Sequence, residues 1–153
     1  MSPSRRRKLP EPFQFFVDRG LGRGDVPSAL RGAIEQGEGV HLHDDHFAQS
    51  TADVEWLTAV GERRWVVLSK DAEIRRNPLE LDALLRAGVA AFLLSSGNLR
   101  GEDQGRALAT ALPRIRRALR RSRVPIIATV GADGIVSVLW EDGAKLERAR
   151  RVK

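Results

Sequence analysis

Runs of five or six predominantly apolar residues are the feature that most restricts the fold of this chain. Four of them occupy its middle and end: WVVLS (65–69), VAAFLL (89–94), PIIATV (125–130) and IVSVLW (135–140). Such runs are typical of strands in a mostly parallel sheet that is covered by helices on both faces. FQFFV (13–17) and GVHL (39–42) are shorter strands that come earlier in the chain. The sequence therefore predicts six strands.

Segments with a helical spacing of apolar residues separate these runs. Helices are expected over about 26–36, 52–63, 79–87 and 102–121. Thr51 is a favourable N-cap for the second helix, and Gly88 ends the third. The alternation of strands and helices indicates a three-layer α/β/α sandwich with a mostly parallel central sheet. Since a GADG turn joins the last two runs, a closing β-hairpin is expected near the C-terminus.

The chain divides into one folded domain with a basic extension at each end. Its 153 residues suffice for one hydrophobic core and are too few for two ordinary domains. Residues 1–12 are polar and basic and end in two nearby prolines, which predicts a flexible arm. Residues 13–140 are expected to form the domain, and residues 141–153 a basic, partly helical tail.

The composition excludes several classes of protein. Cysteine is absent, so disulfides, thiolate metal sites and cysteine nucleophiles are excluded. No apolar run is long enough to span a membrane, and the first residues lack the apolar segment of a secretory signal, so a cytoplasmic location is expected. The net charge of +6, with arginines gathered at 5–7, 114–123 and 148–151, favours a polyanionic partner.

Polar residues follow three of the predicted strands close to the point where each strand ends. Asp18 follows the first strand, Asp71 follows the run at 65–69, and Ser95 follows the run at 89–94. Because the carboxyl ends of parallel strands meet at one edge of a sheet, these groups are expected to lie close together. Asp53 begins the helix that leads into the strand before Asp71, so its first turn can point back over the same edge. The sequence therefore predicts that Asp18, Asp53 and Asp71 converge.

Three clustered carboxylates repel one another unless a cation compensates their charge. Oxygen ligands of this kind select Mg²⁺ or Mn²⁺, which activate water and stabilise the charge that develops on a phosphoryl group. The predicted chemistry is therefore metal-assisted phosphodiester hydrolysis, with Asp18, Asp53 and Asp71 as catalytic residues and metal ligands. Taken singly, each acid also fits an ordinary structural role as a loop residue, a first-turn helix acid or an N-cap.

Other polar residues near these strand ends are candidate substrate contacts. They are Arg19, Lys70, Arg75, Ser96 and Asn98. The cationic side chains would contact phosphates, whereas the serine and the asparagine would hold a phosphate oxygen or a water molecule. The arginines of the helix at 102–121 are expected to bind the flanking phosphates.

All three histidines of the chain lie in the stretch HLHDDHF at 41–47, at the end of the second strand and in the loop predicted to follow it. His41 and His43 would point to the same face of the strand with His46 nearby, so a Zn²⁺ or Ni²⁺ site is geometrically possible. Such sites need three or four well-placed ligands with supporting hydrogen bonds, which one strand end rarely provides. The stretch is therefore interpreted as a loop beside the carboxylate site.

Four longer segments connect these observations to a known family. They are VDRGLGR (17–23), HDDHFAQSTADVEWL (43–57), RRWVVLSKDAEIR (63–75) and FLLSSGNL (92–99). Their order and spacing resemble the PIN-like nucleases, and more narrowly the small stand-alone PIN-like proteins of bacterial toxin–antitoxin modules. In that pattern a first-strand aspartate precedes an aspartate that opens a D-x-E-W-L helix and a strand that ends in S/T-K-D. The resemblance covers about residues 13–140.

The resemblance implies a Mg²⁺- or Mn²⁺-dependent ribonuclease in which Asp18, Asp53 and Asp71 bind the metal. PIN nucleases generally have one further acid, on a helix between the first aspartate and the later pair. In that interval this chain offers Glu35, Glu38, Asp44 and Asp45. Asp45 is the preferred fourth ligand, because it is expected in a loop that follows a strand and can turn toward the other acids.

Two hypotheses of function follow. The leading one is an endoribonuclease that cleaves single-stranded RNA with a metal-activated water, as the toxin of a toxin–antitoxin module restrained by a cognate antitoxin protein. The alternative is a non-catalytic PIN-like module that binds nucleic acid or protein, because the further acid departs from the family pattern. A phospho-acceptor receiver domain ranks below both, since it needs a lysine after the last parallel strand and PIIATVGADG has none. A homodimer is possible under either hypothesis.

Overall fold

The computed structural model describes residues 7–21, 24–70, 77–95 and 99–153. The strands in these ranges are β1 (Gln14–Val17), β2 (Gly39–Leu42), β3 (Val66–Lys70), β4 (Ala90–Leu94), β5 (Ile126–Val130), β6 (Val136–Glu141) and β7 (Ala144–Arg151). They form a single sheet in the order β2-β1-β3-β4-β5-β6-β7. The first five strands of this order are parallel, whereas β6 and β7 are antiparallel to their neighbours.

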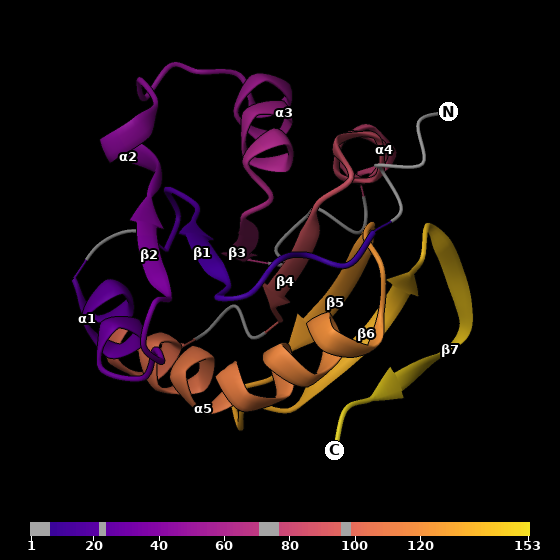
Figure 1. The fold of residues 1–153 in the computed structure, drawn as a ribbon. Coiled ribbons are helices and arrows are strands. Elements are labelled where there is room, and N and C mark those ends of the chain that lie inside the picture. The colour runs from indigo at the N-terminus through magenta and orange to yellow at the C-terminus, as the bar shows by residue number, and fades with distance from the viewer. Residues whose placement is uncertain (1–6, 22–23, 71–76, 96–98) are drawn as a thin grey trace.

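Helices cover both faces of the sheet. They are α1 (Asp25–Arg31), α2 (His43–His46), α3 (Asp53–Arg63), α4 (Pro78–Ala87) and α5 (Gly101–Arg121). Figure 1 shows α1 and α5 together on one face and α3 and α4 on the other. Two apolar cores result, one around Phe15 and Leu108 beneath α5 and one around Phe16 and Trp56 beneath α3. The predicted three-layer α/β/α sandwich with a mostly parallel sheet is confirmed. None of the described helices is long and apolar enough to cross a membrane.

The C-terminal segment differs from its prediction. Instead of a partly helical tail, residues 144–151 form β7, which pairs with β6 beyond the predicted hairpin. Asp142 and Gly143 make the two-residue turn between the strands, with φ angles of 54° and 79°. Positive φ at both positions is the requirement of a type I′ turn, for which Asp-Gly is a preferred pair. The turn sequence, and not an apolar pattern, therefore specifies this last hairpin.

Three local expectations in the first half of the chain are also wrong. The helix predicted over 26–36 ends at Arg31, because Gly32 follows and the next residues turn back toward α5. The loop predicted after β2 contains the short helix α2. Thr51 is not an N-cap, since α3 begins only at Asp53 and no side chain caps it.

The described part of the N-terminal arm is packed against the domain. Leu9 is 8% exposed and belongs to the core beneath α5. The backbone N–H of Val124 donates a hydrogen bond of 3.1 Å to the carbonyl oxygen of Arg7. Residues 7–12 therefore lie against the domain next to the connection that leads into β5, which differs from the expected flexible arm.

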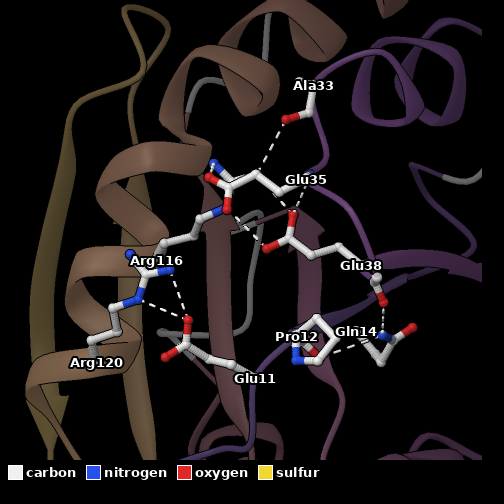
Figure 2. A network of polar contacts seen from close by, with 9 residues as sticks. Glu11, Pro12, Gln14, Ala33, Glu35, Glu38, Arg116 and Arg120 are labelled. Atoms are coloured by element: carbon white, nitrogen blue, oxygen red, sulfur yellow. Dashed lines mark hydrogen bonds and ion pairs between the residues drawn. The ribbon is translucent and has the colours of Figure 1, made fainter.

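Figure 2 shows how α5 holds the arm and the segment before β2. Arg116, which is 5% exposed, donates hydrogen bonds of 2.8 and 3.0 Å to the carboxylate of Glu38 and one of 3.1 Å to the carbonyl oxygen of Ala33. Arg120 donates two hydrogen bonds, of 2.7 and 2.9 Å, to Glu11. We call these four charged side chains the arginine–glutamate clamp. Arg116 and Arg120 thus bind carboxylates of their own chain, contrary to the prediction that the arginines of this helix contact phosphates.

The clamp is electrostatically matched. Burial of the Glu38 side chain raises the pKa of this carboxyl. Hydrogen bonds from Arg116 and from the N–H of Glu35 outweigh burial, so the pKa of Glu38 lies below its ordinary value. The pKa of Arg116 is raised by the same hydrogen bond to Glu38. Both groups are therefore charged at neutral pH, and each stabilises the other in a nearly dry environment.

Candidate active site

Asp18 lies at the carboxyl end of β1, which is flanked by the parallel strands β2 and β3. Its N–H donates to the carbonyl oxygen of Leu68 at 3.0 Å, which continues the pairing of β1 with β3 by one residue. Its carboxylate accepts a hydrogen bond of 2.7 Å from the buried hydroxyl of Ser69 and one of 2.6 Å from the N–H of Arg19. Both donors are neutral groups, so they fix the carboxylate without compensating its charge.

Asp53 is the first residue of α3, and its carboxylate is held by the same helix. The indole N–H of Trp56 donates a hydrogen bond of 2.9 Å to Oδ1 of Asp53. Trp56 is 5% exposed and packs on Phe16 with a ring-centroid separation of 5.3 Å. This buried tryptophan therefore has two roles, because its ring packs in the core and its polar edge orients Asp53. An aspartate three residues before a tryptophan in a helix is the sequence signal for this contact.

Asp18 and Asp53 line one cavity of about 140 Å³. Ser69 contributes to its wall, and the apolar part of the wall comes from α3, α4, β3 and β4. The predicted edge of the sheet thus brings together two of the three expected acids. Asp71, the third, directly follows β3 in the sequence but lies outside the described residues, as do Arg75, Ser96 and Asn98.

Glu80 is an acid of the same cavity that the sequence analysis missed. It lies in the first turn of α4, which begins with Asn77 as N-cap and Pro78. The side-chain oxygen of Asn77 accepts a hydrogen bond of 3.0 Å from the N–H of Leu79, which fixes the start of the helix beside the cavity. The sequence P-L-E-L after an N-cap asparagine marks such a first-turn acid, but only the fold shows that the turn faces Asp18 and Asp53.

None of the acids that were expected to supply the fourth ligand lines the cavity. Asp45 is exposed on α2 and does not line the cavity. Asp44 forms an ion pair of 3.4 Å with Arg19. Glu35 and Glu38 lie near Arg116 at the clamp. The acid that lines the cavity besides Asp18 and Asp53 is Glu80 of α4, which comes after the third predicted acid in the chain, and the preference for Asp45 stays a prediction.

The two described cations predicted to contact substrate have different surroundings. The guanidinium of Arg19 bonds to Asp44 and, at 3.5 Å, to the carbonyl oxygen of Gln49, so it connects the end of β1 to α2 and the segment after it. Lys70 is half-buried at the end of β3, and its aliphatic chain lies next to Gly20. Both residues stay close to Asp18 along the chain, but their contact with a substrate is a prediction.

The donor set of the cavity fits a hard divalent cation. Carboxylate oxygens are the ligands that Mg²⁺ and Mn²⁺ prefer, and neither Asp18 nor Asp53 forms an ion pair with a lysine or arginine in the described ranges. Among the described residues, no three histidine or acidic side chains lie close enough to bind one metal ion jointly. The prediction that Asp71 joins Asp18 and Asp53 concerns a residue outside the described ranges.

The three histidines pack into an aromatic cluster. The ring of His41 stacks on Trp65 with centroids 3.9 Å apart and an angle of 8°, and His46 meets the same indole edge-on at 5.0 Å. Burial lowers the pKa of His41, and the nearby His46 and Arg63 lower it further. His43 is 3% exposed and contacts Phe16. A histidine metal site finds no support in this arrangement.

A close helix contact sets the position of α3 and hence of Asp53. A Cβ atom added to Gly61 would lie 2.3 Å from the carbonyl oxygen of Ala87, at the end of α4. Real Cβ atoms do not approach a carbonyl oxygen so closely, so any larger residue would push the helices apart. The two helices that carry Asp53 and Glu80 are therefore fixed relative to each other at their opposite ends.

Comparison with known proteins agrees with this architecture. A model of the PIN like domain family matches residues 13–96, which is more than half of the chain. A protein named "Putative ribonuclease VapC45" from Mycobacterium tuberculosis (strain ATCC 25618 / H37Rv) is 34% identical over 138 residues, covering 88% of this chain and 97% of the relative. No solved structure matches the chain significantly. On the family match and on a relative aligned along nearly its whole length, the chain belongs to the PIN-like domain family.

Proposed function

We propose that the protein is a Mg²⁺- or Mn²⁺-dependent endoribonuclease whose reaction takes place in the cavity of Asp18 and Asp53. The observation that carries the proposal is the position of these two acids: they come from separate elements, line one cavity, and have neutral hydrogen-bond donors as partners. Membership of the PIN-like family and similarity to a protein named as a ribonuclease support it. Asp71 is proposed as the third acid and Glu80 as the fourth.

The residues of the chain would divide the work as follows. Asp18, Asp53 and Asp71 would bind the cation, and Ser69 and Trp56 would keep the first two carboxylates oriented. A bound Mg²⁺ or Mn²⁺ supplies water activation and offsets the negative charge that develops on the phosphoryl group. Arg19 and Lys70 would approach the phosphates beside the cleaved bond, and Arg75, Ser96 and Asn98 stay predictions for the same role.

The biological setting belongs to the same proposal. The substrate would be single-stranded RNA in the cytoplasm, and a cognate antitoxin protein would restrain the activity, as the resemblance to toxin–antitoxin PIN-like proteins implies. A homodimer is compatible with this setting and is tested directly by the mass of the purified protein in solution.

The decisive experiment is RNA cleavage by the purified protein with Mg²⁺ or Mn²⁺, with EDTA, and with the variants Asp18→Asn, Asp53→Asn and Asp71→Asn. We expect EDTA and each variant to lower the rate by at least about 100-fold, because each removes part of the ligand set. Asp103→Asn is the matched control, since it removes a half-exposed carboxylate of α5 outside the cavity. Cleavage that survives EDTA and all three variants would contradict the proposal.

The non-catalytic module remains the second candidate, because the further acid of the family pattern has no clear counterpart between Asp18 and Asp53. Calorimetric titration with Mn²⁺ separates the two functions. Binding that is lost in Asp18→Asn supports the nuclease, whereas absence of binding at millimolar Mn²⁺ together with retained RNA binding supports the module.

A further inference from the structure

A second polar pocket lies at the end of the sheet opposite the carboxylate cavity. It has a volume of about 400 Å³ and is lined by Lys8, Arg121, Arg123 and Asp142. These residues come from the arm, the end of α5, the connection into β5 and the β6–β7 turn. We call it the basic pocket. The basic pocket adjoins the amino end of β5, whereas Asp18 lies at the carboxyl end of β1. Along the strand direction, the pocket and Asp18 are therefore separated by about the length of a five-residue strand, which is about 17 Å.

The walls of the basic pocket are tied together by backbone hydrogen bonds. The N–H of Arg123 donates 2.7 Å to the carboxylate of Asp142, and the N–H of Asp142 donates 2.9 Å to the carbonyl oxygen of Arg123. Next to them, Val124 bonds to Arg7 and Gly143 to Pro125. The carboxylate of Asp142 is therefore engaged in holding the turn, and the segments that carry Lys8 and Arg123 are fixed before any ligand arrives.

The cations of this pocket form no direct ion pair of the kind that other arginines of the chain have. Arg116 and Arg120 pair with glutamates in the clamp, and Arg150 pairs with Glu141 at 2.5 Å. In contrast, Lys8, Arg121 and Arg123 form no ion pair with any carboxylate in the part of the chain that is described.

The nearest acids are already engaged. The carboxylate of Glu141 accepts hydrogen bonds from Arg150 and also from Ser122, which lies between Arg121 and Arg123 in the sequence. Glu11 is engaged by Arg120. Three cations and one committed carboxylate give the pocket a net positive charge, so it is suited to an anion that comes from outside the chain.

We propose that the basic pocket binds backbone phosphates of RNA at a distance from the cleavage site. Guanidinium groups form paired hydrogen bonds with phosphate oxygens, and two of them converge here with an ammonium group. The described residues that line the pocket include no aromatic side chain, so we expect a contact with phosphates that is independent of base sequence. The inference rests on the proposed ribonuclease function for the identity of the polyanion, but it concerns binding and not cleavage.

The test is the affinity for a fluorescein-labelled oligouridylate long enough to reach both ends of the sheet, measured by anisotropy in EDTA at several salt concentrations. In Arg121→Gln/Arg123→Gln we expect about tenfold weaker binding and a salt slope smaller by about 1.4, because two phosphate contacts are lost on a single strand. Lys8→Gln, in the arm, is the milder second variant and should lower the slope by about 0.7.

Arg31→Gln/Arg148→Gln is the matched control. It removes the same charge from two exposed arginines, on α1 and β7, that lie outside the pocket. Its affinity should change by less than about twofold. Equal losses in both double variants would overturn the proposal, because only net charge would then matter. So would weakened binding of poly-glutamate with unchanged binding of RNA, which would assign the pocket to an acidic protein segment.

The two proposals fail separately. RNA cleavage with normal oligouridylate affinity in the pocket variants overturns the basic pocket and leaves the nuclease intact. Pocket-dependent binding without any divalent-dependent cleavage overturns the nuclease and leaves the basic pocket intact. Absence of oligouridylate binding by the wild-type protein overturns the basic pocket as an RNA site, whatever the cleavage assay gives.

Discussion

The carboxylate cavity and the arginine–glutamate clamp lie at opposite ends of the same strands and treat acidic side chains in opposite ways. In the clamp, Glu11 and Glu38 each receive a guanidinium at hydrogen-bond distance. In the cavity, the donors to Asp18 and Asp53 among the described residues are a hydroxyl, a peptide N–H and an indole N–H. The charges of the clamp hold segments of the chain together, whereas the carboxylates of the cavity are the ones that we propose bind a divalent cation.

The contrast between the clamp and the cavity indicates how structural and functional acids can be distinguished in this fold. A carboxylate whose charge is matched within the chain contributes to stability, and its removal leaves an unpaired guanidinium. A carboxylate that is only oriented by neutral donors contributes little to stability, because clustering it with other acids costs free energy. A substitution in the clamp should therefore lower stability more than activity, whereas a substitution in the cavity should lower activity more than stability.

The largest effect is expected for Arg116→Ala in the clamp. Glu38, whose side chain is 3% exposed, would remain buried without its guanidinium, so the free energy of unfolding should fall by about 3–5 kcal/mol. Urea denaturation measures this loss. Arg116→Ala/Glu38→Ala should lose less than the sum of the two single variants, and strict additivity would show that the two side chains do not interact.

The ion pair between Glu141 and Arg150 should make stability depend on pH. The hydrogen bond from Arg150 lowers the pKa of Glu141 from 4.5 to about 2. Because the folded pKa is the lower one, the pair stabilises the fold fully above pH 4.5, and this contribution is lost as the pH falls toward 2. The shift corresponds to about 3 kcal/mol. Glu141→Gln should flatten the thermal stability between pH 5 and 2 relative to wild type, and an unchanged pH profile would contradict the assignment.

A smaller effect is expected for Glu80→Gln in the cavity. If Glu80 adds a ligand or holds one, the affinity for Mn²⁺ and the rate of RNA cleavage should each fall about tenfold, or about 1.4 kcal/mol. Calorimetry and a cleavage assay measure the two quantities. Glu102→Gln, an exposed acid of α5, is the control and should match wild type. Wild-type metal affinity in Glu80→Gln would remove this residue from the site.

The smallest change in stability is expected for Asp18→Asn, and this variant distinguishes the cavity from the clamp most clearly. Asp18→Asn should change the free energy of unfolding by less than about 1 kcal/mol, because Ser69 can still donate to the amide oxygen and one repelling charge is removed. The same variant should lose the thermal stabilisation that Mn²⁺ gives to the wild-type protein. A loss of several kcal/mol in the absence of metal would show that Asp18 is a structural residue.

The strands were largely predictable because burial on both faces leaves continuous apolar runs such as those of β3 and β4. β7 was not, since AKLERARR is mostly exposed and its pairing depends on the Asp142–Gly143 turn. The partners of the α5 arginines could not be predicted either. Arg116 meets Glu38 across 78 residues and Arg120 meets Glu11 across 109, and no local pattern encodes such contacts.

The candidate site shows the same limit. The positions of Asp18 and Asp53 followed from the rule that parallel strands end at one edge, and the cavity contains both. Glu80 was not predicted, because the family pattern has the further acid before Asp53. Only the fold shows that α4, farther along the chain, returns to the cavity. The preference for Asp45 came from its expected loop, but the residues concerned form α2 and Asp45 is exposed.

The contact of Gly61 with Ala87 has a consequence for how the carboxylates are spaced. Asp53 and Gly61 are at opposite ends of a rigid rod about 12 Å long, since a helix rises about 1.5 Å per residue. Enlarging residue 61 would tilt this rod about its far end and change the separation of Asp53 from Asp18 without touching either. A position that carries no polar side-chain atom thus influences the separation of Asp53 from Asp18, and with it the geometry that the proposed metal site requires.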